Sequence, residues 1–409
     1  MLFTGLPGTV VSAANAARLL PRAYMEIPVS FRVSAPVAGA KTARLKRMPC
    51  SRQDNRRRRR YAPALPLALL LAGVAASAQQ TVPLTVVSGY PPTALWVETF
   101  LTHFIPEADR LLAAQDRYAI DWNTPFGSLT RPSGAFEAVQ YGVADIGIIT
   151  TPFHADKIPF YNISYVTPFV TTDIGLVART VSDLHDRYPA LRELWRDYRQ
   201  VYLVAAGLVD TYQALMSRPI GALGDFRGLK MSGVGMNLLY FEGLDAVAVS
   251  AGLVDFYNNL STGLTDGAIV WPEAVISYKL YEVGPYLVDA RLGAVNSVAL
   301  SANERTWERL PDEVRRALLA AAEVYRDALA LETVRRSERA MASYQDLGGT
   351  IVALSDEQRR EWAASVPDLA SAWVADIERR GLPGNELLSA YMDTMRENDQ
   401  PVMRHWDQE

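Results

Sequence analysis

Two stretches of the chain, Asp225–Gly235 (DFRGLKMSGVG) and Val254–Leu287 (VDFYNNLSTGLTDGAIVWPEAVISYKLYEVGPYL), indicate an α/β fold. The first is an apolar strand with glycines, and the second contains a helical segment followed by an apolar strand that begins after Gly267. This order is a β-α-β pattern, and ligands of such sheets bind beyond the carboxyl ends of the strands. We therefore expect Ser232–Gly235 and Val270–Glu273 to lie at the mouth of a binding site.

The residues upstream also alternate between strand and helix. Short apolar runs are separated by segments in which apolar residues recur at helical spacing. The expected strands are Leu84–Ser88, Tyr118–Trp122, Asp145–Thr150 and Val201–Ala206, and the expected helices are Ala94–Ala114, Phe136–Val143 and Val181–Asp197. Strands that alternate with helices favour a parallel sheet.

The downstream residues contain further strands and one long helix. Tyr212–Ser217, Ala294–Ser301 and Thr350–Leu354 have the composition of strands. Pro311–Leu347 is expected to be a single helix, because proline suits the first turn and the acidic residues after it suit the positive end of the helix dipole. Ser355 begins another helix with a capping pattern, and Glu386–Glu397 is the last helix.

Residues 1–78 have a composition unlike that of the rest of the chain. Arg56–Arg60 are five consecutive arginines, an apolar run covers Ala62–Ala76, and Ala76-Ser77-Ala78 resembles a cleavage site. This order is typical of a secretory signal, and the run is shorter than the roughly 20 residues of a membrane span. We expect export through a signal that ends near Ala78, and a true start at Met48 behind an over-extended beginning.

Removal of this segment would leave an acidic chain without cysteine. Residues 1–78 carry 13 of the 41 basic residues and 2 of the 45 acidic residues, so the rest has a formal net charge of −15. That charge disfavours nucleic acids, because phosphate binding needs a basic surface. The single cysteine, Cys50, also lies in this segment. The exported chain would therefore contain no disulfide and no thiolate chemistry.

The sequence lacks the motifs of common enzyme classes. It contains no G-x-S-x-G, H-E-x-x-H or G-x-x-x-x-G-K-[ST] pattern, and its four histidines are scattered. We therefore expect no catalytic residue, no metal site and no cofactor. A secreted enzyme that works from a cleft remains the alternative, because a fold alone does not exclude catalysis.

Aromatic and polar residues that follow the expected strands are the candidates for ligand binding. Binding pockets combine apolar walls with a few placed polar groups. The candidates are Ser88, Tyr90, Thr150, Phe153, Tyr212, Gln213, Ser232, Trp271 and Glu273. Trp271 is the strongest of them, because it stands between an apolar strand and Pro272.

Several motifs, in order along the chain, resemble those of one family. Gly127–Ile148 (GSLTRPSGAFEAVQYGVADIGI), the DFRGLK and STGLTDG segments of the opening stretches, and Asn303–Leu318 (NERTWERLPDEVRRAL) are similar to segments of TRAP transporter extracytoplasmic solute receptors of the DctP type. The resemblance covers about Thr81 to Leu354. It implies two α/β domains around a hinged cleft, with a long helix that spans both domains.

The resemblance also implies domain limits, partners and location. The first domain would comprise residues 79–206 and 296–335, and the second residues 207–295 and 336–409 with the C-terminal helices. The protein would reside in the periplasm, bind a small organic solute and deliver it to two membrane permease subunits. A sensory subunit that reports occupancy to a membrane kinase is a further alternative.

Two positions depart from the family pattern. Most members have an arginine, which holds the carboxylate of the solute, where this chain has Ser232, and an asparagine where it has Val270. Three hypotheses follow for the solute. It is an organic acid held by another base (Arg131, Lys157 or Arg179), a neutral aromatic compound, or an amine held by Trp271 and Glu273 through cation–π and ionic contacts.

Overall fold

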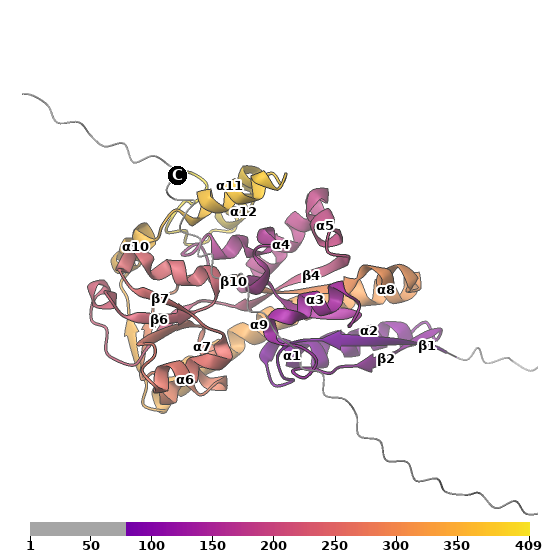
Figure 1. Ribbon diagram of the computed structural model, residues 1–409, viewed down its shortest axis with the longest axis horizontal. Coiled ribbons are helices and arrows are strands. Elements are labelled where there is room, and N and C mark those ends of the chain that lie inside the picture. The colour runs from indigo at the N-terminus through magenta and orange to yellow at the C-terminus, as the bar shows by residue number, and fades with distance from the viewer. Residues whose placement is uncertain (1–78) are drawn as a thin grey trace, which may run out of the picture. The chain divides into compact units, whose positions relative to one another are not determined.

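The computed structural model describes residues 79–409. The predicted signal and the predicted start at Met48 fall in residues 1–78 and lie outside the described residues. The described part contains two mixed sheets with helices packed around them, which is the α/β class that the sequence predicts (Figure 1).

The first sheet has five strands in the order β2-β1-β3-β10-β4. Strand β1 is parallel to β2 and β3, whereas β10 is antiparallel to both β3 and β4. Every side chain of β3 and β10 is buried, as expected of central strands covered on both faces. The strands are β1 (Gln80–Val87), β2 (Tyr118–Asn123), β3 (Ile146–Thr150), β4 (Gln200–Val209) and β10 (Val295–Asn303).

The helices of this part differ from the prediction in two places. The segment expected as one helix over Ala94–Ala114 contains a π-helical stretch, η2 (Phe100–Phe104), between α1 (Leu95–Thr99) and α2 (Ile105–Ala113). The segment expected over Val181–Asp197 is two helices that meet at Tyr188, because Pro189 opens the second. A residue before proline avoids helical backbone angles, and Tyr188 is extended. The other helices here are α3 (Ala135–Gln140), α4 (Ile174–Arg187), α5 (Pro189–Arg196) and α8 (Glu304–Arg309), with the 3₁₀ turns η3 (Pro132–Gly134), η4 (Thr151–His154) and η5 (Pro159–Tyr165).

The second sheet has six strands in the order β11-β9-β5-β8-β6-β7. Strands β6, β7 and β8 are parallel, and β5 runs antiparallel to both β8 and β9. The predicted strand after Gly267 is therefore present as β8. The strands are β5 (Gln213–Met216), β6 (Lys230–Gly233), β7 (Val247–Ser250), β8 (Gly267–Val270), β9 (Tyr286–Asp289) and β11 (Thr350–Ala353).

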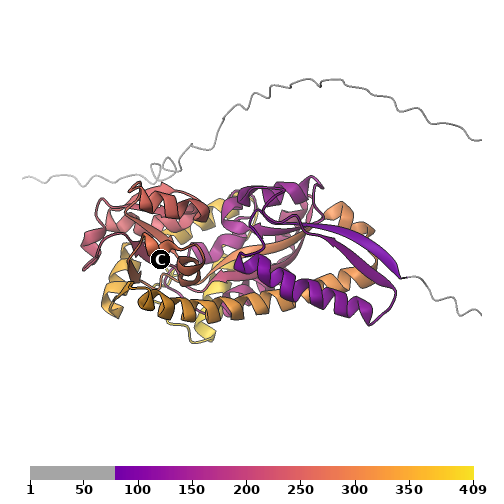
Figure 2. The same ribbon diagram turned by 90° about the horizontal axis from the view of Figure 1, so that it is seen from below.

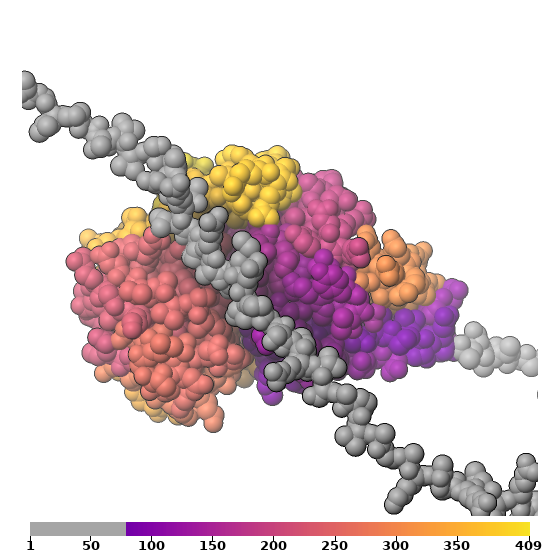
Figure 3. All heavy atoms as spheres, in the orientation of Figure 1, coloured from indigo at the N-terminus to yellow at the C-terminus, as the bar shows by residue number. Residues whose placement is uncertain are grey.

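Short helices connect these strands. A long 3₁₀ segment, η7, joins β6 to β7, and α6 joins β7 to β8. The segments are η6 (Leu223–Phe226), η7 (Gly235–Leu244), η8 (Leu253–Asp255), α6 (Phe256–Ser261), α7 (Pro272–Ser277) and η9 (Leu280–Glu282). We call the five-stranded sheet with its helices the first lobe, and the six-stranded sheet with these segments the second lobe. In the space-filling view the two lobes form a purple and a coral mass (Figure 3).

Two chain segments cross between the lobes side by side. The first runs from β4 to β5 through Asp210–Tyr212, and the second runs from β9 to β10 through Ala290–Ala294. The amide of Leu292 donates to the carbonyl of Tyr212 at 3.1 Å. Gly293 has φ 116°, a value that side chains disfavour. This pair of segments is the natural position of a hinge.

One helix, α9 (Asp312–Asp346), spans both lobes as predicted. It packs against α1, α2 and β4 of the first lobe and against α7 and β11 of the second. Figure 2 shows it as an orange helix that runs along both. The Tyr325 hydroxyl donates to the Trp96 carbonyl at 3.0 Å, and the Tyr344 hydroxyl donates to the Gly284 carbonyl at 2.8 Å. The helix is thus fastened to each lobe by a buried phenol.

The C-terminal residues contact both lobes. Ser355 caps α10 (Asp356–Ser365) through the predicted capping box, and α10 packs on η7. Helices α11 (Leu369–Arg379) and α12 (Gly384–Glu397) pack on η5 and α4 of the first lobe. The indole of Trp406 is buried and donates to the Pro168 carbonyl at 2.8 Å. Within residues 79–409, no helix has the length and apolar character needed to cross a bilayer.

Candidate functional site

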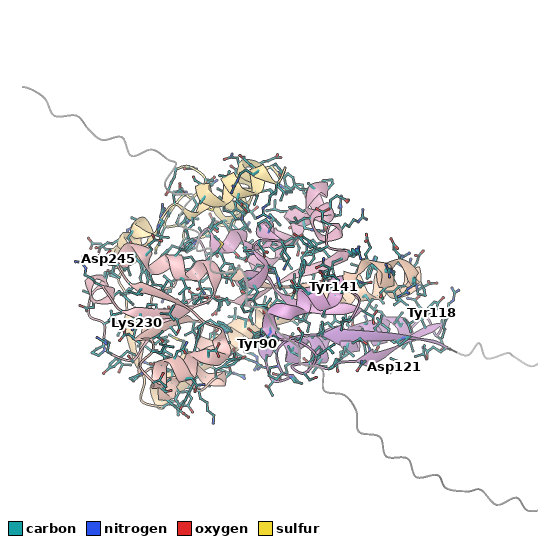
Figure 4. The ribbon with its side chains drawn as sticks, viewed as in Figure 1. Tyr90, Tyr118, Asp121, Tyr141, Lys230 and Asp245 are labelled. Carbon is teal, nitrogen blue, oxygen red and sulfur yellow. The ribbon has the colours of Figure 1, made fainter. Side chains whose placement is uncertain are left out.

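A cavity of about 40 Å³ lies at the junction of the two lobes. Most of its lining residues follow or end strands of the two sheets, the place where ligands of α/β sheets bind. They are Tyr90, Trp96, Thr150, Pro152, Phe153, Tyr165, Leu208, Val209, Tyr212, Val234, Leu253, Trp271 and Ser297. Tyr90 marks this position at the centre of Figure 4. The volume has room for a few water molecules, so a larger solute requires the lobes or the side chains to move apart.

Aromatic side chains form most of the cavity wall. Tyr90 and Trp96 are in edge-to-face contact, with ring centroids 4.6 Å apart. Tyr212 and Trp271 meet at 6.4 Å with an interplanar angle of 70°. Both pairs are largely buried. Such pairs are rigid and present both ring faces and ring edges to a ligand.

Three hydroxyl groups form a chain on one side of the cavity. The Tyr165 hydroxyl lies 2.9 Å from Ser297 Oγ and 3.3 Å from the Tyr212 hydroxyl. Burial raises the pKa of Tyr165 well above its usual value, and it also raises the pKa of Tyr212. Both phenols therefore stay protonated at neutral pH and offer neutral donors and acceptors.

Two carboxyl groups lie next to the cavity without lining it. Trp271 Nε1 donates to Glu273 Oε2 at 3.2 Å, and the Ser337 hydroxyl donates to Asp210 Oδ1 at 3.0 Å. Burial raises the pKa of Glu273, and it raises the pKa of Asp210 to about 6. Burial thus favours the neutral form of both carboxyl groups.

Five of the nine predicted site residues line the cavity. They are Tyr90, Thr150, Phe153, Tyr212 and Trp271. Each follows or ends a strand, which is the pattern that selected them.

The other four predicted residues lie beside the cavity or beneath it. Ser88 Oγ accepts from the amide of Tyr90 at 3.3 Å. Gln213 donates to Asp289 at 2.8 Å, across two neighbouring strands. Glu273 accepts from Trp271 and so holds the indole in position.

Ser232 is buried in the second lobe and makes internal hydrogen bonds. Its Oγ donates to Thr265 Oγ1 at 3.1 Å and accepts from Asn259 Nδ2 at 3.3 Å. Both partners belong to the segment that leads into β8. Val234, two positions further along the chain, is the residue of this segment that lines the cavity.

The three basic residues proposed as substitutes for the family arginine do not line the cavity. Lys157 is paired with Glu137 at 2.5 Å, whereas Arg131 and Arg179 are exposed. The lining set contains no lysine, arginine or histidine among the described residues. A carboxylate in this cavity would therefore depend on hydroxyl and indole donors alone.

Several lining residues escaped the sequence analysis. Trp96 and Tyr165 lie in helical segments, and Ser297 lies in a strand where alternation gives no sign of a cavity. Leu208 and Leu253 are apolar and indistinguishable from core residues in sequence. One feature of the sequence could have identified Ser297 as a site residue. A serine near the start of a strand of buried apolar residues needs a polar partner.

The comparisons with known proteins agree with this architecture. The family of bacterial extracellular solute-binding proteins, family 7 (DctP), matches residues 122–375, more than half of the chain. The chain belongs to this family. Its members are TRAP extracytoplasmic solute receptors, so the resemblance drawn from the motifs is confirmed. They bind solutes rather than transform them, and the protein is a receptor rather than an enzyme.

A curated relative matches a smaller part of the chain. The C4-dicarboxylate-binding periplasmic protein DctP of Rhodobacter capsulatus is 29% identical over 150 residues, which are 35% of this chain and 44% of that protein. The match thus spans less than half the length of the relative.

Solved structures share the whole fold of this receptor. A TRAP periplasmic solute-binding protein from Bordetella bronchiseptica, with bound (R)- and (S)-mandelate, has a TM-score of 0.67 and 20% identity and covers 78% of this chain and 100% of its own. A TRAP solute-binding protein from Rhodoferax ferrireducens, in complex with copurified benzoate, has a TM-score of 0.67 and 19% identity. The match covers 78% of this chain and 98% of that protein. At these identities the likeness concerns the fold.

Proposed function

We propose that this receptor captures a small organic solute in the cavity between its lobes and delivers it to two membrane permease subunits of a TRAP-type transporter. The observation that carries the proposal is the position of the cavity. Its lining residues come from both sheets and lie beside the two crossing segments. A solute held there would touch both lobes and favour their closed arrangement.

The proposal places the receptor in the periplasm, after export through the signal that the sequence predicts near Ala78. Family membership supports an extracytoplasmic location. Closure on a solute would create the surface that the permease subunits recognise, because those subunits must distinguish loaded from empty receptor.

Two observations bear on the chemical class of the solute. Relatives with the same fold bind mandelate and benzoate, which favours an organic acid. The cavity of this chain has aromatic walls and no basic lining residue, which favours a solute with an apolar or aromatic body and no dependence on an ion pair with arginine.

A thermal-shift screen of the purified protein tests the proposal. A solute at 100 times its dissociation constant stabilises the fold by about 2.7 kcal/mol. We expect at least one small organic solute to raise the melting temperature of the wild type and to lose this effect in Trp271→Ala. Tyr141→Phe, which changes an exposed aromatic residue on the surface, is the control, and we expect the solute to raise its melting temperature as it does that of the wild type. Failure of a broad library of acids, amines, alcohols and sugars to bind would contradict the proposal.

A further inference from the structure

We infer that the solute of this receptor is a small organic ammonium ion that also carries an oxygen acceptor. This inference rests on the proposed function, because it assumes that the solute occupies the cavity between the lobes. It differs from the ion pair between arginine and carboxylate that the family resemblance implies. Three independent features of the described residues support it.

The first feature is the aromatic wall. Six aromatic side chains line a single cavity: Tyr90, Trp96, Phe153, Tyr165, Tyr212 and Trp271. Their ring systems carry negative charge on their faces, and proteins that recognise quaternary ammonium ions surround them with such rings. A carboxylate gains nothing from the same faces, because its charge has the opposite sign.

The second feature is the balance of charge around the wall. Glu273 lies directly behind Trp271, at the end of the hydrogen bond from the indole, and Asp210 adjoins the cavity residue Val209. An indole whose N–H is bonded to a carboxylate has a more electron-rich ring, which strengthens its attraction for a cation.

The basic group whose field reaches Glu273 is already engaged. Arg336 binds Glu98 at 2.9 Å and Glu332 at 3.4 Å. Arg335 also pairs with Glu332, so the three acids Glu273, Glu98 and Glu332 face two arginines. Glu273 is the one of these acids that makes no ion pair with either arginine. An ammonium ion in the cavity would complete the balance, whereas a carboxylate would increase the repulsion.

The third feature is a buried donor without a partner. Trp96 lines the cavity and is 2% exposed, and its Nε1 has no hydrogen-bond partner among the described residues. Buried donors in folded proteins are almost always paired, and an unpaired one indicates a missing partner. An oxygen on the solute, such as a hydroxyl or carbonyl, would satisfy this donor.

Isosteric probes of different charge test the inference by titration calorimetry. Choline and its uncharged isostere 3,3-dimethyl-1-butanol differ only in the charge of the quaternary centre. Benzylamine, benzyl alcohol and benzoate form a second series around one ring. We expect choline to bind at least tenfold more tightly than its isostere, and benzylamine to bind more tightly than both of its partners. Tetramethylammonium, which lacks the hydroxyl, is expected to bind more weakly than choline.

A variant that removes the charge of Glu273 shows whether charge or shape determines the affinity for choline. Glu273→Gln keeps an acceptor for Trp271 Nε1 and removes the charge, so we expect choline affinity to fall roughly tenfold while that of the isostere is unchanged. Glu361→Gln, at an exposed position of α10, is the matched control and leaves both affinities unchanged. Unchanged unfolding curves without ligand show that each variant is folded.

The possible outcomes distinguish the two proposals. Tighter binding of benzoate than of benzylamine, or equal binding of choline and its isostere, overturns the ammonium inference and leaves the receptor function intact. Equal loss of both affinities in Glu273→Gln also overturns it, because the carboxylate would then act through shape. Binding by no member of these series or of a broad library overturns the receptor proposal as well.

Discussion

The hydroxyl of Tyr165, in the first lobe, lies 3.3 Å from the hydroxyl of Tyr212, at the start of the second. The two residues are 47 positions apart in the chain and meet at the edge of the cavity. Tyr240 of the second lobe adds a hydrogen bond of 2.7 Å to the Tyr165 carbonyl. Tyr165 thus connects the two lobes through its side chain and its backbone, beside the proposed solute.

Removal of the Tyr165 hydroxyl is expected to weaken both solute binding and the fold. In Tyr165→Phe, Ser297 and Tyr212 lose a buried partner, which costs about 1 kcal/mol of unfolding free energy. We expect solute affinity to fall about five- to tenfold by calorimetry. Tyr141→Phe, at a tyrosine that is 71% exposed, is the control and changes neither quantity. A wild-type affinity in Tyr165→Phe would contradict a role of this hydroxyl at the site.

Ser232→Ala is expected to change stability without changing solute affinity. Ser232 Oγ makes hydrogen bonds to Thr265 and Asn259 and does not line the cavity. The variant should lose about 1 kcal/mol of unfolding free energy in urea denaturation, because two buried partners lose a hydrogen bond. A large loss of solute affinity together with unchanged stability would show that this serine touches the solute.

The sequence predicted the strands of the two sheets better than it predicted which side chains line the cavity. Each β-α-β crossover was readable, because a glycine or proline marks where a strand such as β8 ends. Ser232 lies within β6, whereas Val234 follows its last residue, and the exact end of a strand is poorly marked in a sequence. The sequence placed Ser232–Gly235 at the mouth of a site but could not tell which of these residues lines the cavity, where the structure has Val234.

One of the two helix irregularities could not be predicted from the sequence. Nothing in the apolar spacing of residues 94–114 marks the π-helical stretch Phe100–Phe104, where Phe100 and Phe104 stack with ring centroids 4.3 Å apart. Such stretches depend on tertiary packing. The break at Pro189 was readable in principle, since proline rarely continues a helix.

Asp210 is expected to make the protein less stable as the pH rises. Burial raises its pKa from 3.8 to about 6, so its charged form is disfavoured in the folded state. The contribution of Asp210 to the free energy of unfolding is fully present below pH 3.8 and is lost as the pH rises through about 6. Asp210→Asn keeps an acceptor for Ser337 and should be more stable than the wild type by about 1–2 kcal/mol at pH 7.5, but not at pH 4.

Urea denaturation at several pH values checks this prediction. Asp121→Asn is the control, because Asp121 is an exposed residue of β2 at the far end of the first lobe (Figure 4). Its variant should follow the wild-type profile. A constant difference between Asp210→Asn and the wild type from pH 4 to 7.5 would contradict a raised pKa.

Gly293→Ala is expected to destabilise the crossing segments. Gly293 has φ 116°, and a Cβ there would lie 3.2 Å from the amide nitrogen of Phe169. Backbone strain of this kind costs about 1–3 kcal/mol. Gly224→Ala is the matched control, since a Cβ at Gly224 meets no atom within 4 Å, and its stability should stay the same or rise slightly. Equal unfolding free energies of the two variants would contradict this assignment of strain.

Native mass spectrometry of the receptor purified from its own host tests the central claim most directly. We predict a stoichiometric small molecule bound to the wild type and absent from Trp271→Ala, with both proteins equally folded by circular dichroism. A wild-type protein that carries no small molecule and binds none from a broad library would contradict the account, as would a Trp271→Ala protein that retains the molecule in full.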